Sequence, residues 1–149
     1  MQNLSTTHRA EIRDHDEIAV PVGNGKTGFV DVRDIAAVAV RALTYPVTEN
    51  HAYTLTGGAA LDYYQAAETL SHALGRTIRD SNPSLLSFVC RQVFAGRPLR
   101  FTLVMAALYT MTRLGNAAEV TADVRDLLGR EPITLDQFAY DYRNCWMSV

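Results

Sequence analysis

Gly25-Lys26-Thr27 comes nearest in this sequence to a phosphate-binding motif, because a P-loop ends in Gly-Lys-Ser/Thr and wraps its backbone amides around phosphates. That motif also needs a glycine five residues before Gly25, where Val20 stands, and a helix directly afterwards. Apolar runs at 18–22 and 28–32 instead predict two short strands, and the Asn-Gly pair between them is typical of a tight turn. We therefore interpret 23–27 as a hairpin turn.

The run Asp14-His15-Asp16-Glu17 has side chains that could hold a metal ion. Adjacent residues rarely converge on one ion without a distant ligand of matching type, so a solvated polar turn is the favoured interpretation. His8, His51 and His72 have no cysteine or serine at a spacing that implies a nucleophile, and we expect them to be structural or exposed. The sequence thus predicts neither a catalytic nor a metal-binding residue in this chain.

Dinucleotide binding is not expected of the isolated chain. We expect no G-x-G-x-x-G fingerprint of dinucleotide-binding proteins anywhere in the chain, and therefore no glycine-rich turn that could hold a pyrophosphate. The sequence also has no Tyr-x-x-x-Lys pair of the kind that short-chain dehydrogenases use for proton transfer.

The composition excludes several classes of partner. Fourteen basic and sixteen acidic residues are mixed along the chain and give a net charge of -2, so we expect no nucleic-acid partner. The apolar stretch 103–111 is far shorter than the roughly 20 residues that cross a bilayer, and 1–9 lacks the apolar core of a signal peptide. Cys90 and Cys145 lie far apart in apolar patterns, which suggests free thiols in a reducing compartment. We expect a cytoplasmic protein without a membrane partner.

The 149 residues fit one domain, with a short β-containing start at 1–58 and a helical part at 59–149. Beside the two strands already named, 51–55 predicts a third. Helices are expected after the caps Asp31, Asp62 and Thr134, after Asn82-Pro83, and over the segments 99–114 and 121–128. Apolar side chains are expected to face inward from these helices at Ile35, Val38 and Ala42; at Ala66, Ala67, Leu70 and Leu74; and at Leu85, Val89 and Val93.

The order of several segments resembles the second half of NmrA-like proteins, which are atypical short-chain dehydrogenases. The resemblance rests on Met1-Gln-Asn-Leu4, Gly28-Phe-Val-Asp-Val-Arg-Asp-Ile-Ala-Ala37, Tyr53-Thr-Leu-Thr-Gly57, Leu74-Gly75-Arg76 and the tail 124–142 with Leu128-Gly-Arg-Glu-Pro132. In that family a Rossmann domain precedes these segments and binds NAD(P). The resemblance implies an α+β or truncated α/β fold, mainly helical, whose few short strands would belong to a Rossmann-like sheet.

The same resemblance implies a function. Gln2 and Asn3 would lie at the substrate or nicotinamide side of a cleft, although a loop capped by their amides is an equally good interpretation. The chain would be the substrate-binding and assembly part of an NAD(P)-dependent oxidoreductase acting on a small molecule, and not catalytic alone. The alternative is a non-catalytic dinucleotide-sensing or protein-interaction regulatory module. Unpaired strands and the apolar helix 99–114 predict a homodimer.

Overall fold

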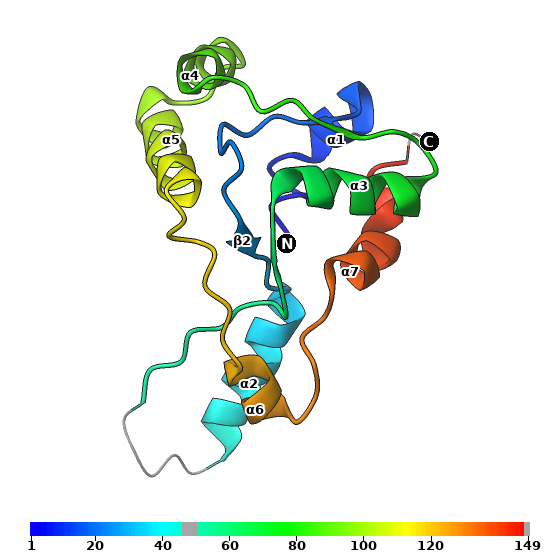
Figure 1. Cartoon of the computed structure of the whole chain (residues 1–149), viewed down its shortest axis with the longest axis vertical. Coiled ribbons are helices and arrows are strands. Elements are labelled where there is room, and N and C mark those ends of the chain that lie inside the picture. The colour runs from blue at the N-terminus through cyan, green and yellow to red at the C-terminus, as the bar shows by residue number, and fades with distance from the viewer. Residues whose placement is uncertain (46–50, 148–149) are drawn as a thin grey trace.

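The computed structural model describes residues 1–45 and 51–147, and it is mainly helical with a few short strands (Figure 1). The helices are α1 (Arg9–His15), α2 (Val32–Thr44), α3 (Tyr63–Leu74), α4 (Leu85–Phe94), α5 (Leu99–Arg113), α6 (Asp123–Leu128), α7 (Leu135–Tyr142) and the 3-10 helix η1 (Arg143–Cys145). The strands are β1 (Glu17–Ile18), β2 (Thr27–Gly28), β3 (Ala60–Leu61) and β4 (Arg79–Asp80). The expected fold class is confirmed.

The strands differ from the prediction in length and in pairing. β1 pairs in parallel with β4, and β2 pairs antiparallel with β3, so the apolar runs beside the Asn-Gly turn do not form a hairpin with each other. The predicted strand 51–55 is wrong: this segment carries no strand hydrogen bonds. Side chains hold it instead, since the Thr54 amide donates to Asp123 at 2.7 Å and Thr121 donates to the Thr54 carbonyl.

Three predicted helix caps are confirmed. The carboxylates of Asp31 and Asp62 and the hydroxyl of Thr134 each accept a backbone amide of the first turn. Asp62 forms a complete capping box with Gln65, whereas Gln137 donates its side-chain amide to Asp141 rather than completing a box at Thr134.

The predicted start of α4 is wrong. Its cap is Ser84 rather than Asn82-Pro83, and Asn82 has a left-handed backbone with φ of 35°. The side-chain oxygen of Asn82 accepts the Gly23 amide at 2.9 Å, so this residue links two loops instead of opening the helix.

The predicted inner faces of α2 and α4 are wrong in part. On α4 the buried side chain is Phe88, while Leu85 and Val93 are about two-fifths exposed, at 40% and 41%. On α2, Val38 is buried as predicted, but Ile35 is exposed and the second fully buried residue is Asp34, at the first turn. The carboxylate of Asp34 accepts the Ile133 amide at 2.8 Å and pairs with Arg130 at 2.7 Å, which makes an acidic side chain acceptable in the interior.

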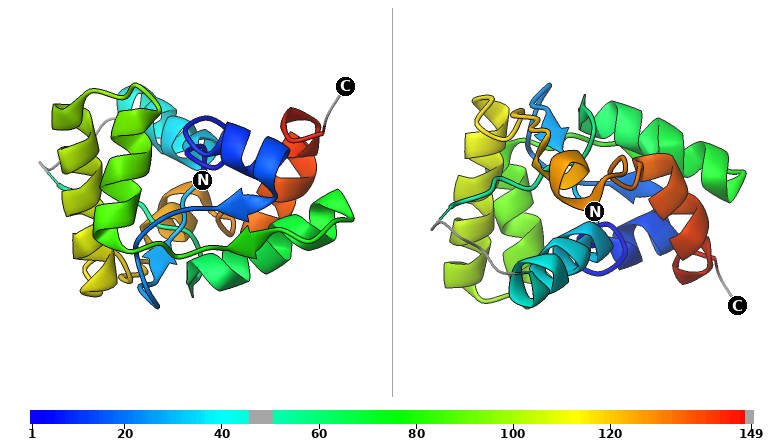
Figure 2. Two further views of the ribbon diagram at one scale, coloured as in Figure 1. Left: turned by 90° about the horizontal axis from the view of Figure 1, so that it is seen from above. Right: turned by 90° about the horizontal axis from the view of Figure 1, so that it is seen from below.

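The main core is formed by buried side chains of the N-terminal loop, α1, α3 and α7, and it includes Phe88 of α4 and Tyr109 of α5. The helices α2 and α6 lie side by side, as do α4 and α5 (Figures 1 and 2). Trp146 and Phe138 are fully buried there with their rings edge to face, and the Trp146 indole donates to the Leu4 carbonyl at 3.0 Å. The first residues of the chain are therefore fastened to its last helix. Among the described residues, no helix is long and apolar enough to span a bilayer.

Candidate functional site

The loop before α1 is tied to the first turn of α2 by one side chain, that of Gln2. Its amide nitrogen donates to the Asp31 carboxylate at 3.0 Å, and its amide oxygen accepts the Val32 backbone amide at 2.9 Å. Gln2 thus assists Asp31 in capping the helix. Asn3, the other residue predicted at the cleft, has an exposed side chain. The structure therefore gives Gln2 two bonds to its own chain, as a loop capped by amides requires, and it leaves Asn3 facing solvent.

Asp31 is fully buried and keeps its charge through several donors. Burial opposes ionisation of this carboxyl, but the Arg33 guanidinium at 2.8 Å, the Arg33 backbone amide and the Gln2 amide together hold its pKa below the usual value. Arg33 also reaches Asp141 on α7 at 2.6 Å, so one arginine joins the start of α2 to α7. The bonds to Asp31 and Asp141 raise the pKa of Arg33, which stays cationic.

A cavity of about 370 Å³ lies beside Met1. Its walls are mostly apolar side chains and backbone from four segments: Met1, Phe29, Gly58 with Ala59 and Leu61, and 131–136. The Met1 amine donates to the Val30 carbonyl at 2.7 Å, and burial lowers its pKa against the opposing pull of Asp31. Neither Gln2 nor Asn3 is among the residues that line this cavity, although both follow Met1 directly.

A line of three titratable side chains joins the N-terminal loop to α5. The Nδ1 atom of His8 lies 2.9 Å from the Glu11 carboxylate, and its Nε2 atom lies 2.8 Å from the Tyr109 hydroxyl. His8 and Tyr109 are buried, and burial raises the pKa of Tyr109 well above its usual value. Sequence reasoning missed this line because Tyr109 is 101 residues beyond His8; the only local signal was the three-residue spacing of His8 and Glu11.

The other two histidines lie elsewhere. His51 is exposed with its ring 4.7 Å from that of Tyr53, and His72 is exposed on α3. The neighbouring tyrosines at the start of α3 differ in exposure: Tyr63 is buried against Phe29, and Tyr64 is exposed.

The acidic run 14–17 does not converge on one point. Asp14 pairs with Arg13, Asp16 with Arg76, and Glu17 with Arg91 at 2.7 Å. α1 ends within this run, where Asp16 has a left-handed backbone conformation, and β1 begins at Glu17. Within 1–45 and 51–147, no three potential ligands are grouped closely enough to hold a metal ion.

The expectation that the chain has no dinucleotide fingerprint is wrong as far as glycine spacing is concerned. Gly23, Gly25 and Gly28 do have the G-x-G-x-x-G spacing, which the expectation of no dinucleotide fingerprint overlooked. The third of them, Gly28, lies in the strand β2 and not in the turn that opens a helix, and a side chain at Gly25 would collide with the Thr112 carbonyl, its Cβ lying 2.4 Å from that oxygen. These glycines let two parts of the chain approach closely, so the turn does not fit a dinucleotide diphosphate.

No family model matches the chain. The uncharacterized oxidoreductase YesF of Bacillus subtilis is 35% identical over 149 residues, covering 99% of this chain and 52% of YesF. An NAD(P)H azoreductase of Xenophilus azovorans is 39% identical over 139 residues, which are 93% of this chain and 48% of the enzyme. The chain thus spans about half the length of the curated relatives it matches.

Solved structures agree on the fold. A NADPH-dependent quinone oxidoreductase of Escherichia coli superposes with a TM-score of 0.85 at 21% identity, over 95% of this chain and 52% of the enzyme. A Citrobacter triphenylmethane reductase complexed with NADP(H) gives 0.82 at 22% identity, over 95% and 49% of the two chains. The relatives in sequence are oxidoreductases, and the chain has the fold of about half of such a reductase.

Proposed function

We propose that this chain is the substrate-binding and assembly half of an NmrA-like, NAD(P)H-dependent oxidoreductase, and that it performs no redox chemistry by itself. The observation that carries the proposal is the match over nearly the whole chain to about half of an NAD(P)H azoreductase and of YesF. In this proposal the dinucleotide supplies the hydride and is held by a nucleotide-binding half, while this chain encloses a small electrophilic substrate.

Two features of the chain support that division of work. The glycine turn is filled by the backbone at Thr112, and the start of α2 is already capped by Asp31 and Gln2, so the chain itself occupies these two places. The cavity beside Met1, in contrast, has largely apolar walls. Its volume would suit a small molecule or side chains of another polypeptide.

Complementation tests the proposal directly. The chain would be mixed or co-expressed with the separately produced nucleotide-binding half of the Xenophilus azoreductase, and NADPH oxidation would be followed with a quinone and with an azo dye. We expect no turnover from either half alone and measurable turnover from the pair. Leu61→Glu, which places a carboxylate in the cavity wall, should abolish the gain, whereas Leu43→Glu on the exposed side of α2 should retain it. Turnover by the chain alone, or none by a pair that demonstrably associates, would contradict the proposal.

A regulatory interaction module is the second candidate, and the surface of α4 and α5 favours it. Large apolar side chains there are strongly exposed, among them Leu86 at 74%, Phe94 at 90% and Leu114 at 72%. Such a surface is typical of a partner contact. We propose that it mediates a homodimer in the cytoplasm. The two candidates separate in the complementation experiment, because a regulatory module would not restore turnover.

A further inference from the structure

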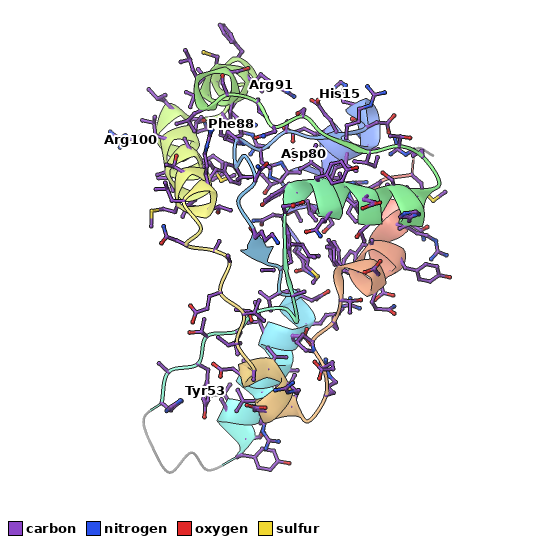
Figure 3. The ribbon with its side chains drawn as sticks, viewed as in Figure 1. His15, Tyr53, Asp80, Phe88, Arg91 and Arg100 are labelled. Atoms are coloured by element: carbon purple, nitrogen blue, oxygen red, sulfur yellow. The ribbon has the colours of Figure 1, made fainter. Side chains whose placement is uncertain are left out.

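Two depressions adjoin each other between the loop before α3 and the connection from α6 to α7. The first is the cavity at the amino end of the chain, with a volume of about 370 Å³, and the second has about 240 Å³. Gly58, Glu131 and Pro132 line both of them. The connection that supplies Glu131 and Pro132 runs beside α2 (Figure 3), where the Ile133 amide donates to Asp34. We call the two depressions together the Gly58 groove.

Only the first depression is large enough to be a ligand site by itself. Ligand pockets in proteins usually have volumes of about 300–1,000 Å³. The first depression lies at the lower end of this range, and the second lies below it. The second depression is therefore an extension of the first, and the Gly58 groove as a whole has the size of an ordinary ligand pocket with an elongated shape.

The walls of the Gly58 groove favour a flat apolar molecule. Phe29 and Leu61 line the first depression, and Val120 and Ala122 line the second. The ring of Phe29 is fixed by the buried ring of Tyr63, which meets it edge to face with the centroids 5.4 Å apart. A fixed aromatic ring in the wall suits an aromatic ligand, because aromatic pairs gain more than their buried area alone provides.

The charged side chains of the Gly58 groove do not call for an ionic ligand. Arg125, in the second depression, lies 3.9 Å from Glu131 at the shared border, and both side chains are more than half exposed. Asp136, in the first depression, is exposed as well. Solvent screens exposed charges, and the opposite charges of Arg125 and Glu131 offset each other. A neutral ligand is therefore the best match to these walls.

Gly58 differs from the other eight glycines of the chain. Each of those either has a positive φ or would place a Cβ against the backbone of another segment, as Gly57 would against the Phe29 carbonyl. Gly58 has no positive φ, and a Cβ at this position would meet no atom within 4 Å. Neither the backbone nor the packing requires glycine here. What the missing side chain leaves free is space at the border of the two depressions.

We propose that the Gly58 groove binds a neutral molecule with two linked aromatic rings, one beside Phe29 and the other beside Val120, and that Gly58 is the specificity-determining residue that admits the second ring. That such a molecule is the substrate rests on the proposed redox function. Its binding does not, because the groove is built from this chain alone.

Titration with two probes, followed by NMR, tests the proposal without any redox reaction. Phenol and 4-hydroxybiphenyl have the same hydroxyl-bearing ring, and only the latter has a second ring. We expect the parent chain to bind 4-hydroxybiphenyl at least about ten-fold more tightly than phenol, because the second ring adds contacts in the second depression. Gly58→Leu should remove most of this difference by weakening 4-hydroxybiphenyl alone, whereas the smaller change Gly58→Ala should retain most of it.

Two further variants make the result specific. Ala122→Leu enlarges a side chain of the second depression only, so it should also weaken 4-hydroxybiphenyl selectively, and it replaces Gly58→Leu if that variant does not fold. Ala36→Leu, on the exposed side of α2 and outside both depressions, should bind both probes as the parent does.

Equal affinity of the parent for the two probes would overturn the proposal, as would unchanged binding of 4-hydroxybiphenyl by folded Gly58→Leu or Ala122→Leu. The redox function is judged separately. Turnover of a quinone by the complemented pair, without binding of 4-hydroxybiphenyl by this chain, would reject the Gly58 groove and keep the proposed function.

Discussion

The side-chain amide of Gln2 lies 3.0 Å from the carboxylate of Asp31, so a residue at the start of the chain completes the cap of a helix that begins 30 residues later. Asp31 accepts from Gln2 and Arg33 at once, and Arg33 continues to Asp141 on α7. The N-terminal loop, α2 and α7 are therefore joined by one connected set of charges and amides.

Replacing Gln2 tests this connection. Gln2→Ala removes a donor to a buried carboxylate and an acceptor for a helix amide, and we expect a loss of about 1–2 kcal/mol in the free energy of unfolding. Urea denaturation followed by circular dichroism would measure it. Asn3→Ala, next along the chain with an exposed side chain, is the control and should change stability by less than about 0.5 kcal/mol. If both variants were as stable as the parent, Gln2 would be free for the ligand role that the NmrA-like resemblance implies.

Asp62→Ala should cost roughly 1 kcal/mol, because it removes the acceptor of the Gln65 amide at 2.8 Å at the start of α3. Thermal melting reports the change, and ligand affinity, where any is found, should not respond. Asp62→Asn retains an acceptor oxygen and should restore most of the loss. A melting temperature unchanged by Asp62→Ala, combined with lost ligand binding, would instead place Asp62 in a binding site.

Asp80 gives a pH-dependent prediction. Burial raises the pKa of its carboxyl, with a smaller contribution from nearby Asp62, so folding favours the protonated form. The stability that this group contributes is present below its unfolded pKa of about 3.8 and is lost as the pH rises through the higher folded pKa. Asp80→Asn should therefore raise the melting temperature at pH 7 and have no such effect near pH 3. The gain should stay below about 1 kcal/mol, because the carboxyl is only partly buried.

The control for Asp80→Asn is Glu68→Gln, which removes a negative charge from an exposed position on α3. It should change the melting temperature only slightly, because the side chain is exposed. A gain for Asp80→Asn that persisted unchanged at pH 3 would show that burial of the charge is not its cause.

Calorimetric titration with NADH and with NADPH should detect no binding to the chain alone. The physical reason is that its glycine turn is filled by backbone and its first capped helix terminus is already satisfied. Micromolar affinity for either dinucleotide would show that this account of the missing diphosphate site is wrong.

Light scattering coupled to gel filtration should give about twice the chain mass of 16.5 kDa at low micromolar concentration. Leu108→Glu on the exposed side of α5 should return the protein to a monomer, and Leu43→Glu on α2 should not. A cooperative, monomeric parent would refute the predicted dimer.

Sequence reasoning succeeded where an interaction spans only a few residues. The caps at Asp31, Asp62 and Thr134 depend on contacts within one helical turn, and each was visible in the residue types alone.

Sequence reasoning failed where the interacting residues are far apart in the sequence. The segment 51–55 has strand-like residues, yet its partners are side chains of Thr121 and Asp123 rather than a backbone edge. The helix α1 was not anticipated, because it has a single fully buried residue, Ile12, and no side-chain cap. The pairing of His8 with Tyr109 likewise depends on a contact between residues 101 positions apart, which no local pattern encodes.

The placement of Met1 has a practical consequence for handling the protein. Its nitrogen is hydrogen-bonded to the Val30 carbonyl, and Met1 is one of the residues that line the cavity. Residues added before Met1 would therefore begin next to this cavity. Affinity tags and fluorescent fusions therefore belong at the carboxyl end, and a tag at the amino end would compete with whatever molecule or polypeptide is being tested for binding there.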